Sequence, residues 1–182
     1  MFMKATGIVR RIDDLGRVVV PKEIRRTLRI REGDPLEIFT DREGEIILKK
    51  YSPIGELGNL AKLYAESLSQ TMGCTVCITD TDQVVASAGS GKKDLQEQFI
   101  GQELGEALKE RSQILAKNGD VSYIKVTAEM IDYYDEVICP IICEGDVIGA
   151  VVLLSRDEKR RFGEVEQRVA YSAADFLGRQ MA

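Results

Sequence analysis

The stretch Thr6–Leu28 restricts the fold of this chain most, because strand, turn and helix signals follow one another within 23 residues. Gly7–Ile12 and Val18–Val20 are rich in β-branched residues and predict two short strands. Asp13–Gly16 lies between them and supplies turn residues. Pro21 suits the first position of a helix, where its missing N–H leaves no bond unmade. The stretch therefore predicts two strands followed by a helix.

The next segment extends this pattern to a small β-rich unit. Pro35–Thr40 and Glu45–Lys49 predict two further strands, and Asp41–Gly44 supplies the turn between them. The order is then β-β-α-β-β in about fifty residues, and so short a chain buries only about 60% of its unfolded surface. We therefore expect an obligate dimer in which two chains share strands.

Charge is distributed unevenly along the chain. Residues 1–50 hold 12 Lys and Arg against 9 Asp and Glu, a net charge of +3. Residues 51–182 hold 13 against 21, a net charge of -8. Such asymmetry indicates that the basic part meets an anion, so the acidic pI of the whole chain says little about the first fifty residues.

Composition excludes several classes of protein. Hydrophobic and charged residues make up 44% and 30% of the chain, as in a globular protein. No apolar run reaches the roughly 18 residues of a membrane span, and the start lacks an apolar signal core, so we expect a cytoplasmic protein. The chain has no histidine, which removes Ser-His-Asp catalysis and His-ligated metal sites.

The remainder of the chain alternates helix and strand signals. Ser52–Gly55 marks a short linker, so we expect domains at 1–53 and 54–182. Apolar residues recur at three and four positions from Leu57 to Leu68, and again within Gly163–Met181, which predicts two amphipathic helices. These helices could stack on a sheet of their own domain or join the same pair of another chain in a bundle.

Strand patterns fill the region between these helices. Cys74–Thr79 with Val84–Ser87, and Glu136–Ile142 with Val147–Leu154, predict two hairpins. Leu104–Leu115 predicts a helix between them. The second domain is thus expected to be α+β, an antiparallel sheet with flanking helices.

Four cysteines invite a zinc or redox interpretation that strand geometry opposes. An offset of three places Cys74 and Cys77 on opposite faces of a strand, and an offset of four separates Cys139 from Cys143 by about 13 Å. No basic residue is adjacent to activate a thiolate. We expect reduced, buried cysteines, no metal site and no cofactor.

Two further clusters carry no chemistry that we can assign. Asp132, Asp135 and Glu136, near Tyr133 and Tyr134, are expected in a solvated loop, with the rim of an acidic pocket as the alternative, and no general acid or base is predicted among them. Gly89–Lys93 is glycine-rich and basic but lacks the spacing of a phosphate loop, so a mobile hairpin loop is expected. We predict no catalytic residue and no enzymatic activity.

The first fifty residues resemble the AbrB family of transition-state regulators. The resemblance rests on Gly7–Arg10, Leu15–Pro21, Arg25–Leu28 and Ile46–Tyr51, and it covers residues 3–53 nearly continuously. It implies a swapped-hairpin β-barrel dimer that binds double-stranded DNA.

Arg10, Arg17, Arg25 and Arg26 match the DNA-contacting arginines of that family. Independently of the resemblance, the planar donor fork of arginine suits phosphate oxygens and guanine edges. The alternative from the residues alone is that these side chains are solvated or paired with nearby carboxylates.

The second domain resembles a GAF-type sensor domain. The two domains together resemble transcription regulators of sporulation genes in spore-forming bacteria, which activate and repress and form tetramers from both domain types. The resemblance implies a nucleoid-associated protein of the developing spore and leaves a small-molecule ligand open. An antitoxin-like DNA-binding protein and a cysteine-based GAF-fold reductase are the alternatives.

Overall fold

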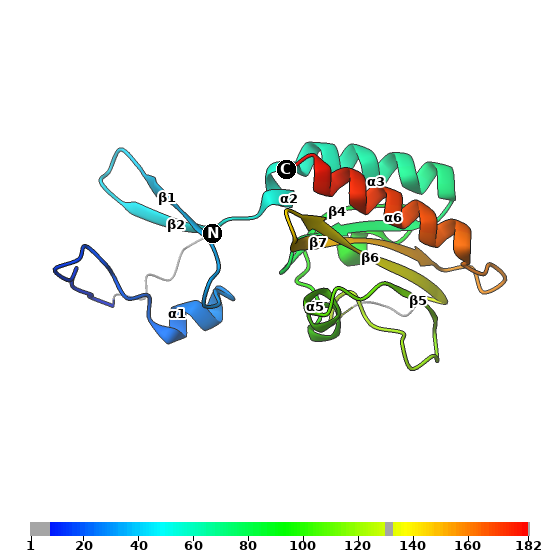
Figure 1. The fold of residues 1–182 in the computed structure, drawn as a ribbon, viewed down its shortest axis with the longest axis horizontal. Coiled ribbons are helices and arrows are strands. Elements are labelled where there is room, and N and C mark those ends of the chain that lie inside the picture. Colours follow the sequence, from blue (N-terminus) through cyan, green and yellow to red (C-terminus); the bar gives the residue numbers. More distant parts are fainter. Residues whose placement is uncertain (1–7, 130–132, 182) are drawn as a thin grey trace. The chain divides into compact units, whose positions relative to one another are not determined.

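The computed structural model describes residues 8–129 and 133–181, so Gly7 and Asp132 lie outside the described residues. The chain divides into two compact units, Met1–Tyr51 and Ser52–Ala182. We call the first unit the head and the second the body, and describe each by itself (Figure 1). The expected boundary, after residue 53, lies within the first helix of the body.

Within residues 8–51, the regular structure of the head is one short helix and one hairpin. They are α1 (Lys22–Thr27), β1 (Leu36–Thr40) and β2 (Ile46–Lys50). The strands pair in antiparallel register, and the Asp41 carboxylate closes their turn by accepting from the amides of Glu43 and Glu45, at 3.0 and 2.8 Å. Both expected strands therefore form, each beginning one residue later than predicted.

The two strands expected before α1 do not form within this single chain. Residues 8–20 contain no strand, although the turn at Asp13–Gly16 is present. The amide of Gly16 donates to the Asp13 carbonyl at 3.0 Å, and Gly16 has φ +75°. Pro21 is the residue before α1 rather than its first helical residue. A strand needs a hydrogen-bonded neighbour, and one copy of the head supplies none for these segments.

The head buries almost nothing. Among residues 8–51, Pro21 alone is buried. Val9 is 90% exposed, Val19 71% and Ile38 70%. Other large apolar side chains of the head share this exposure: Ile12, Leu15, Val18, Leu28, Phe39, Ile46, Ile47 and Leu48. The apolar residues that should form a core thus face outward.

The body is built on an antiparallel sheet of five strands in the order β4-β3-β7-β6-β5. The strands are β3 (Thr75–Thr79), β4 (Val84–Ala88), β5 (Ile114–Lys117), β6 (Asp135–Cys143) and β7 (Asp146–Ser155). Both expected hairpins are present. The β6–β7 turn is tight because Glu144 and Gly145 both have positive φ, 49° and 91°.

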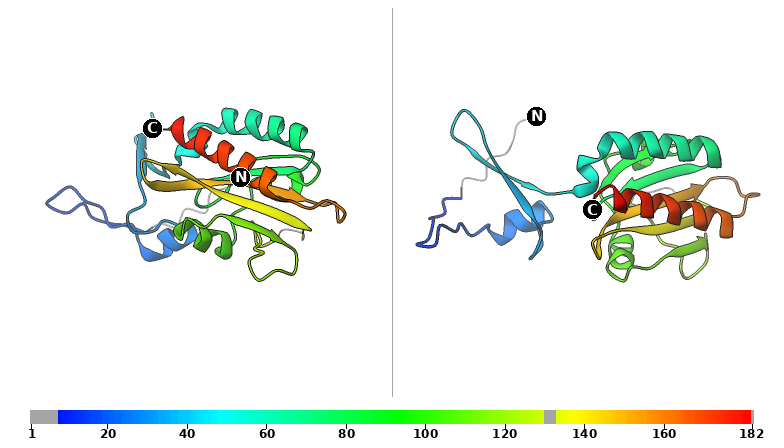
Figure 2. Two further views of the ribbon diagram at one scale, coloured as in Figure 1. Left: turned by 45° about the vertical axis from the view of Figure 1, so that its right-hand side comes forward. Right: turned by 45° about the horizontal axis from the view of Figure 1, so that its top comes forward.

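Helices cover both faces of this sheet (Figures 1 and 2). They are α2 (Pro53–Glu56), α3 (Gly58–Met72), α4 (Lys92–Leu95), α5 (Gln102–Lys109) and α6 (Glu164–Arg179). The two long helices expected from periodicity are α3 and α6, which lie on one face, and α5 lies on the other. Among the described residues, no helix has the length and apolarity to cross a bilayer.

The predicted linker is part of the body. Ser52 caps α2 by accepting from the Gly55 amide at 3.0 Å, and its hydroxyl donates to the Asp80 carboxylate at 2.8 Å. Ile54 is fully buried in the body core. The chain leaving β2 is therefore anchored to the body as soon as it reaches Ser52.

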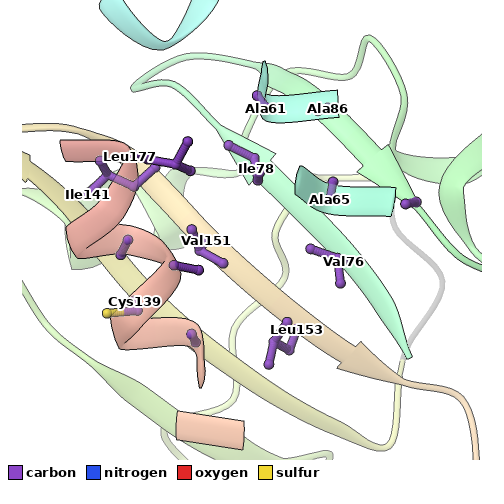
Figure 3. Packing of buried hydrophobic residues seen from close by; sticks show 14 of the residues in the cluster. Ala61, Ala65, Val76, Ile78, Ala86, Cys139, Ile141, Val151, Leu153 and Leu177 are labelled. Atoms are coloured by element: carbon purple, nitrogen blue, oxygen red, sulfur yellow. The ribbon is translucent and has the colours of Figure 1, made fainter. Parts of the chain in front are cut away.

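Each face of the sheet has its own core. On the first face, small side chains of α3 and α6 bring the helices close to the strands (Figure 3). The labelled members of this core are Ala61, Ala65, Val76, Ile78, Ala86, Cys139, Ile141, Val151, Leu153 and Leu177. On the second face, Leu104 and Leu108 of α5 pack with Ile138, Val152 and Leu154. Alternation along each strand explains why one strand serves both cores.

The helix predicted at Leu104–Leu115 is wrong in its second half. The helix ends at Lys109, and Ile114 and Leu115 belong to β5. Arg111 has φ +56°, a left-handed conformation that a helix cannot continue through. Pairing of Ile114 with Ile138 across the sheet then decides the structure of these residues.

The predicted solvated loop of carboxylates is also wrong where it is described. Asp135 is 3% exposed and Glu136 is fully buried, both at the start of β6. The Asp135 carboxylate accepts from the Phe162 amide at 2.9 Å and so holds the segment before α6. The pKa of Glu136 is raised to about 8, mainly by burial and to a smaller extent by the negative charge of Glu103, while the hydrogen bond from the Ile124 amide lowers it. Gly89–Lys93 is no hairpin loop, because Lys92 begins α4 and Gly91 is buried.

We expect Gly178→Ala to destabilise the body. A Cβ at Gly178 would lie 2.2 Å from the Ile142 carbonyl oxygen, so α6 would have to move away from β6. Overpacking of this kind costs about 1–3 kcal/mol, measurable by urea unfolding. Gly163→Ala, at the start of the same helix, meets no atom within 4 Å and is the control. Equal stability of the two variants would contradict this packing.

We expect the body to lose stability as the pH rises from about 4.5 to about 8. The folded chain binds the proton of Glu136 more tightly than the unfolded chain, whose carboxyl has the ordinary pKa of 4.5. Since the folded state holds more protons in this window, its free energy of unfolding falls with pH. Glu136→Gln should flatten that fall in urea unfolding measured at several pH values. An unchanged slope would show that Glu136 is ionised in the folded body.

Candidate functional site

Arg17 lies directly after the turn of the head and is held by it. Its backbone amide donates to Oδ1 of Asp13 at 2.8 Å, and its Nε donates to Oδ2 at 2.8 Å. These two hydrogen bonds lower the pKa of Asp13, the backbone one contributing more. The Arg17 side chain is nevertheless 68% exposed, so its terminal nitrogens face solvent. The turn thus orients a guanidinium group without covering it.

The other three candidate arginines lie on two further segments. Arg10 is exposed on the extended chain before the turn. Arg25 and Arg26 are consecutive residues of α1, half-buried and exposed respectively. Among the described residues, no carboxylate pairs with any of these three. Of the ion pairs considered from sequence, only that of Arg17 forms.

The arrangement suits a polyanion better than a small ligand. The four arginines are spread over three segments of the head, and all but the half-buried Arg25 are exposed. Guanidinium groups keep their charge at any physiological pH and donate in a planar fork that matches phosphate. Such dispersed cations fit a regular row of phosphates, as along a nucleic acid.

The cysteines do not form a second chemical site. Cys74 and Cys139 are buried in the core below α3 and α6, and Cys77 is buried in the core below α5. Burial raises the pKa of Cys77 to about 12 and that of Cys139 to about 11, so both stay protonated at neutral pH. All four cysteines are free, and no cluster of potential metal ligands occurs among the described residues.

A polar region that the sequence did not reveal lies on the α5 side of the sheet. A shallow cavity of about 420 Å³ opens there between α5 and the chain before β6. Its lining comprises Gly101, Gln102, Glu103, Glu106, Lys125 and Ala128. Next to β6, Arg156 lies over the Tyr133 ring at 4.8 Å and pairs with Asp94. From the sequence, Asp135 and Glu136 were considered for the rim of an acidic pocket, but neither residue lines this cavity.

Comparison with known proteins covers the whole chain. It is 54% identical over 180 residues to stage V sporulation protein T of Bacillus subtilis, covering 98% of this chain and 99% of that protein. Residues 56–182 match the family model described as "Stage V sporulation protein T C-terminal, transcription factor".

The two units also have separate relatives. The transition state regulatory protein AbrB of Bacillus subtilis is 68% identical over 53 residues, 29% of this chain and 54% of that protein. Residues 9–56 match the model of the MazE bacterial antitoxins. The GAF domain of a phosphoenolpyruvate-protein phosphotransferase from Coxiella burnetii matches 69% of this chain and 82% of its own, with TM-score 0.56 and 19% identity.

These matches confirm both units of the expected fold, an AbrB-type head followed by a GAF-like α+β body. The body match identifies the fold alone, since its identity is low. The full-length match and the model for residues 56–182 carry the family assignment. The chain belongs to the stage V sporulation protein T family of transcription factors.

Proposed function

We propose that two heads join and hold Arg10, Arg17, Arg25 and Arg26 against double-stranded DNA. Membership of the family makes the chain a DNA-binding transcription regulator of sporulation. In this mechanism, the two heads form a dimer by sharing strands, and their arginines contact the DNA and select its base sequence. It would both activate and repress, in the cytoplasm at the nucleoid of the developing spore.

The dimer is supported by the exposed apolar surface of the head. Val9, Val19 and Ile38 are each at least 70% exposed, and Pro21 is the only buried residue of the described head. Fully burying one such side chain contributes about 1.5–3 kcal/mol. A second copy offers the same strand segments, so residues 8–12 and 18–20 of each chain would find the neighbours that one chain lacks.

Binding of DNA by the head is supported by its arginines. A dimer would present eight guanidinium groups, two sets of the four, from the chain on both sides of the turn and from α1 of each copy. The Arg17–Asp13 pair is exposed, and such pairs contribute little to stability, so Arg17 can exchange its carboxylate for a phosphate at small cost. Some of these side chains would read guanine edges, which accept two hydrogen bonds from one arginine.

The body has a surface suited to assembly. Leu63 of α3 is 65% exposed, and Val165 and Tyr171 of α6 are 66% and 55% exposed. Tyr64 and Phe176 pack against each other across the two helices, with 5.1 Å between ring centroids and an angle of 56° between the ring planes. We propose that this face joins the same face of another copy in a helix bundle, which would make a tetramer from dimers of heads. The body would also sense a small molecule.

Two other functions fit the chain less well. Antitoxins resembling the head carry a disordered tail that wraps a toxin, whereas residues 52–182 here form a sheet with two cores. A thiol reductase needs a reactive thiolate, and burial raises the pKa of Cys74, Cys77 and Cys139. We therefore propose no enzymatic activity for the body.

We expect Arg17→Ala to weaken DNA binding and to flatten its salt dependence. Losing one phosphate contact should reduce the slope of log K against log salt by about 0.9. The measurement is a titration on one genomic fragment at several salt concentrations. Arg42→Ala, an exposed arginine in the β1–β2 turn, is the control and should keep the original slope. If both variants behave alike, Arg17 does not contact the phosphates.

We expect Tyr171→Glu to convert tetramers into dimers. A charge placed in an apolar helix interface would have to lose its water without gaining a partner, which opposes assembly. Val121→Glu adds the same charge at a fully exposed apolar residue of the segment between β5 and β6, and should leave the tetramer intact. Native mass spectrometry distinguishes the two results. Tetramers in both variants would place the interface elsewhere.

A further inference from the structure

The carboxylate of Asp13 is the centre of the hydrogen bonds in the turn of the head. Its Oδ1 accepts from the backbone amides of Leu15 and Arg17, at 3.0 and 2.8 Å. The amide of Asp13 in turn donates to the Arg17 carbonyl at 3.0 Å. Short side chains of Asp and Asn fix turns in this way, because they accept from backbone amides a few residues further on. One oxygen of Asp13 is therefore sufficient to hold the backbone of the turn.

The second oxygen of Asp13 holds a side chain instead. Oδ2 accepts from Nε of Arg17 at 2.8 Å, so one nitrogen of the guanidinium group is tied to the turn. A guanidinium group has five N–H donors, and four of them are on the terminal nitrogens Nη1 and Nη2. The Arg17 side chain is exposed, so these four donors can reach a phosphate while Nε stays on Asp13.

Folding stability does not account for this link. Both residues are exposed, and an exposed ion pair contributes little because water screens it and two side chains lose their freedom. The backbone amides of the turn need one oxygen only, which an asparagine would also supply. A second carboxylate oxygen adds a negative charge, which is unfavourable beside the phosphates of DNA. What this oxygen provides is control of the Arg17 side chain.

We propose that Asp13 is a positioning residue for DNA binding, which holds the Arg17 guanidinium group in one orientation with Nη1 and Nη2 directed to a phosphate. The inference rests on the contact proposed above between Arg17 and DNA. A mobile side chain loses its rotamer freedom on binding, which lowers affinity by about 2- to 12-fold for each side chain. An arginine that the turn already holds avoids most of this loss.

Asp13→Asn separates this role from that of the turn. Asparagine keeps an oxygen for the two backbone amides, but its NH₂ group cannot accept from Nε of Arg17. Charge and orientation then have opposite effects, since loss of a negative charge favours DNA binding and loss of the held arginine opposes it. Asp14→Asn is the matched control. It removes the same charge from the next residue, which is exposed and whose side chain makes no hydrogen bond within the described part of the chain.

The test is a titration of one genomic fragment with the full chain and with both variants at one salt concentration. Asp13→Asn should bind about 5- to 100-fold more weakly than Asp14→Asn, because each of two heads loses a held side chain. Equal affinity of the two variants, or tighter binding by Asp13→Asn, overturns the proposal.

A double-mutant cycle shows whether Asp13 acts through Arg17. In the Arg17→Ala background, Asp13→Asn should change affinity no more than Asp14→Asn does, because no guanidinium group is left to position. The same weakening in that background would mean that Asp13 acts through the turn, and the proposal would be wrong. If Arg17→Ala weakens binding but Asp13→Asn does not, positioning fails while the DNA contact of Arg17 stands.

NMR observes the link without DNA. An Nε–H group that donates to a carboxylate exchanges its proton slowly with water, so the Arg17 Nε–H signal should persist at neutral pH in the original chain and in Asp14→Asn. It should disappear in Asp13→Asn, while the Leu15 and Gly16 amide signals keep their positions because the turn is intact. An Arg17 Nε–H signal equally protected in Asp13→Asn contradicts the proposal.

Discussion

The fold depends first on a shortage of buried surface in the head. A unit of about fifty residues with one short helix cannot enclose its own apolar side chains, and the described head buries Pro21 alone. Apolar residues such as Val19 and Ile38 are therefore available to another chain. In the dimer that we propose, the same requirement would bring two sets of arginines onto one molecule, so stability and DNA binding would have a common origin.

The body, in contrast, buries its apolar side chains within one chain. Helices cover both faces of its sheet, and a hydrophobic core lies on each face. Alanines at positions 61, 65, 170, 173 and 174 let α3 and α6 approach the sheet closely, and Gly178 lets α6 touch the Ile142 carbonyl. That face is apolar and closely packed. The face below α5 instead contains buried polar groups, among them Thr79, Thr127 and Glu136. One face is thus held together by apolar packing and is the face that we propose for assembly, whereas the other face holds buried polar groups.

Much of this was accessible from the sequence because local patterns and tertiary packing agree. The sequence pattern predicts the amphipathic helices α3 and α6 from the spacing of their apolar residues. It also predicts the turn between β6 and β7 at Glu144–Gly145, and the location of Cys74 and Cys77 on opposite faces of the sheet. Ile114 and Leu115 did not follow, because their pairing with β6 overrides a helical pattern. The prediction that Glu136 lies in a solvated loop was wrong because a segment earlier in the chain contacts this side chain, and the Ile124 amide of that segment donates to its Oε1. No local pattern encodes that contact.

The arginines show a second limit of prediction from the sequence. Their resemblance to a known family selected four residues, and the structure adds that Arg10, Arg17 and Arg26 are exposed, that Arg25 is half-buried and that Arg17 is oriented by Asp13. Which surfaces of two heads come together depends on the second copy, so residues 8–12 and 18–20 form no strand here.

The most direct test of the account is an isotope-filtered NMR measurement on dimers that contain one labelled and one unlabelled chain. We expect contacts between protomers from the side chains of Val9, Val19 and Ile38, and strand hydrogen bonds for residues 8–12 and 18–20. Under the same conditions, a head that is folded, monomeric and able to bind DNA would contradict it.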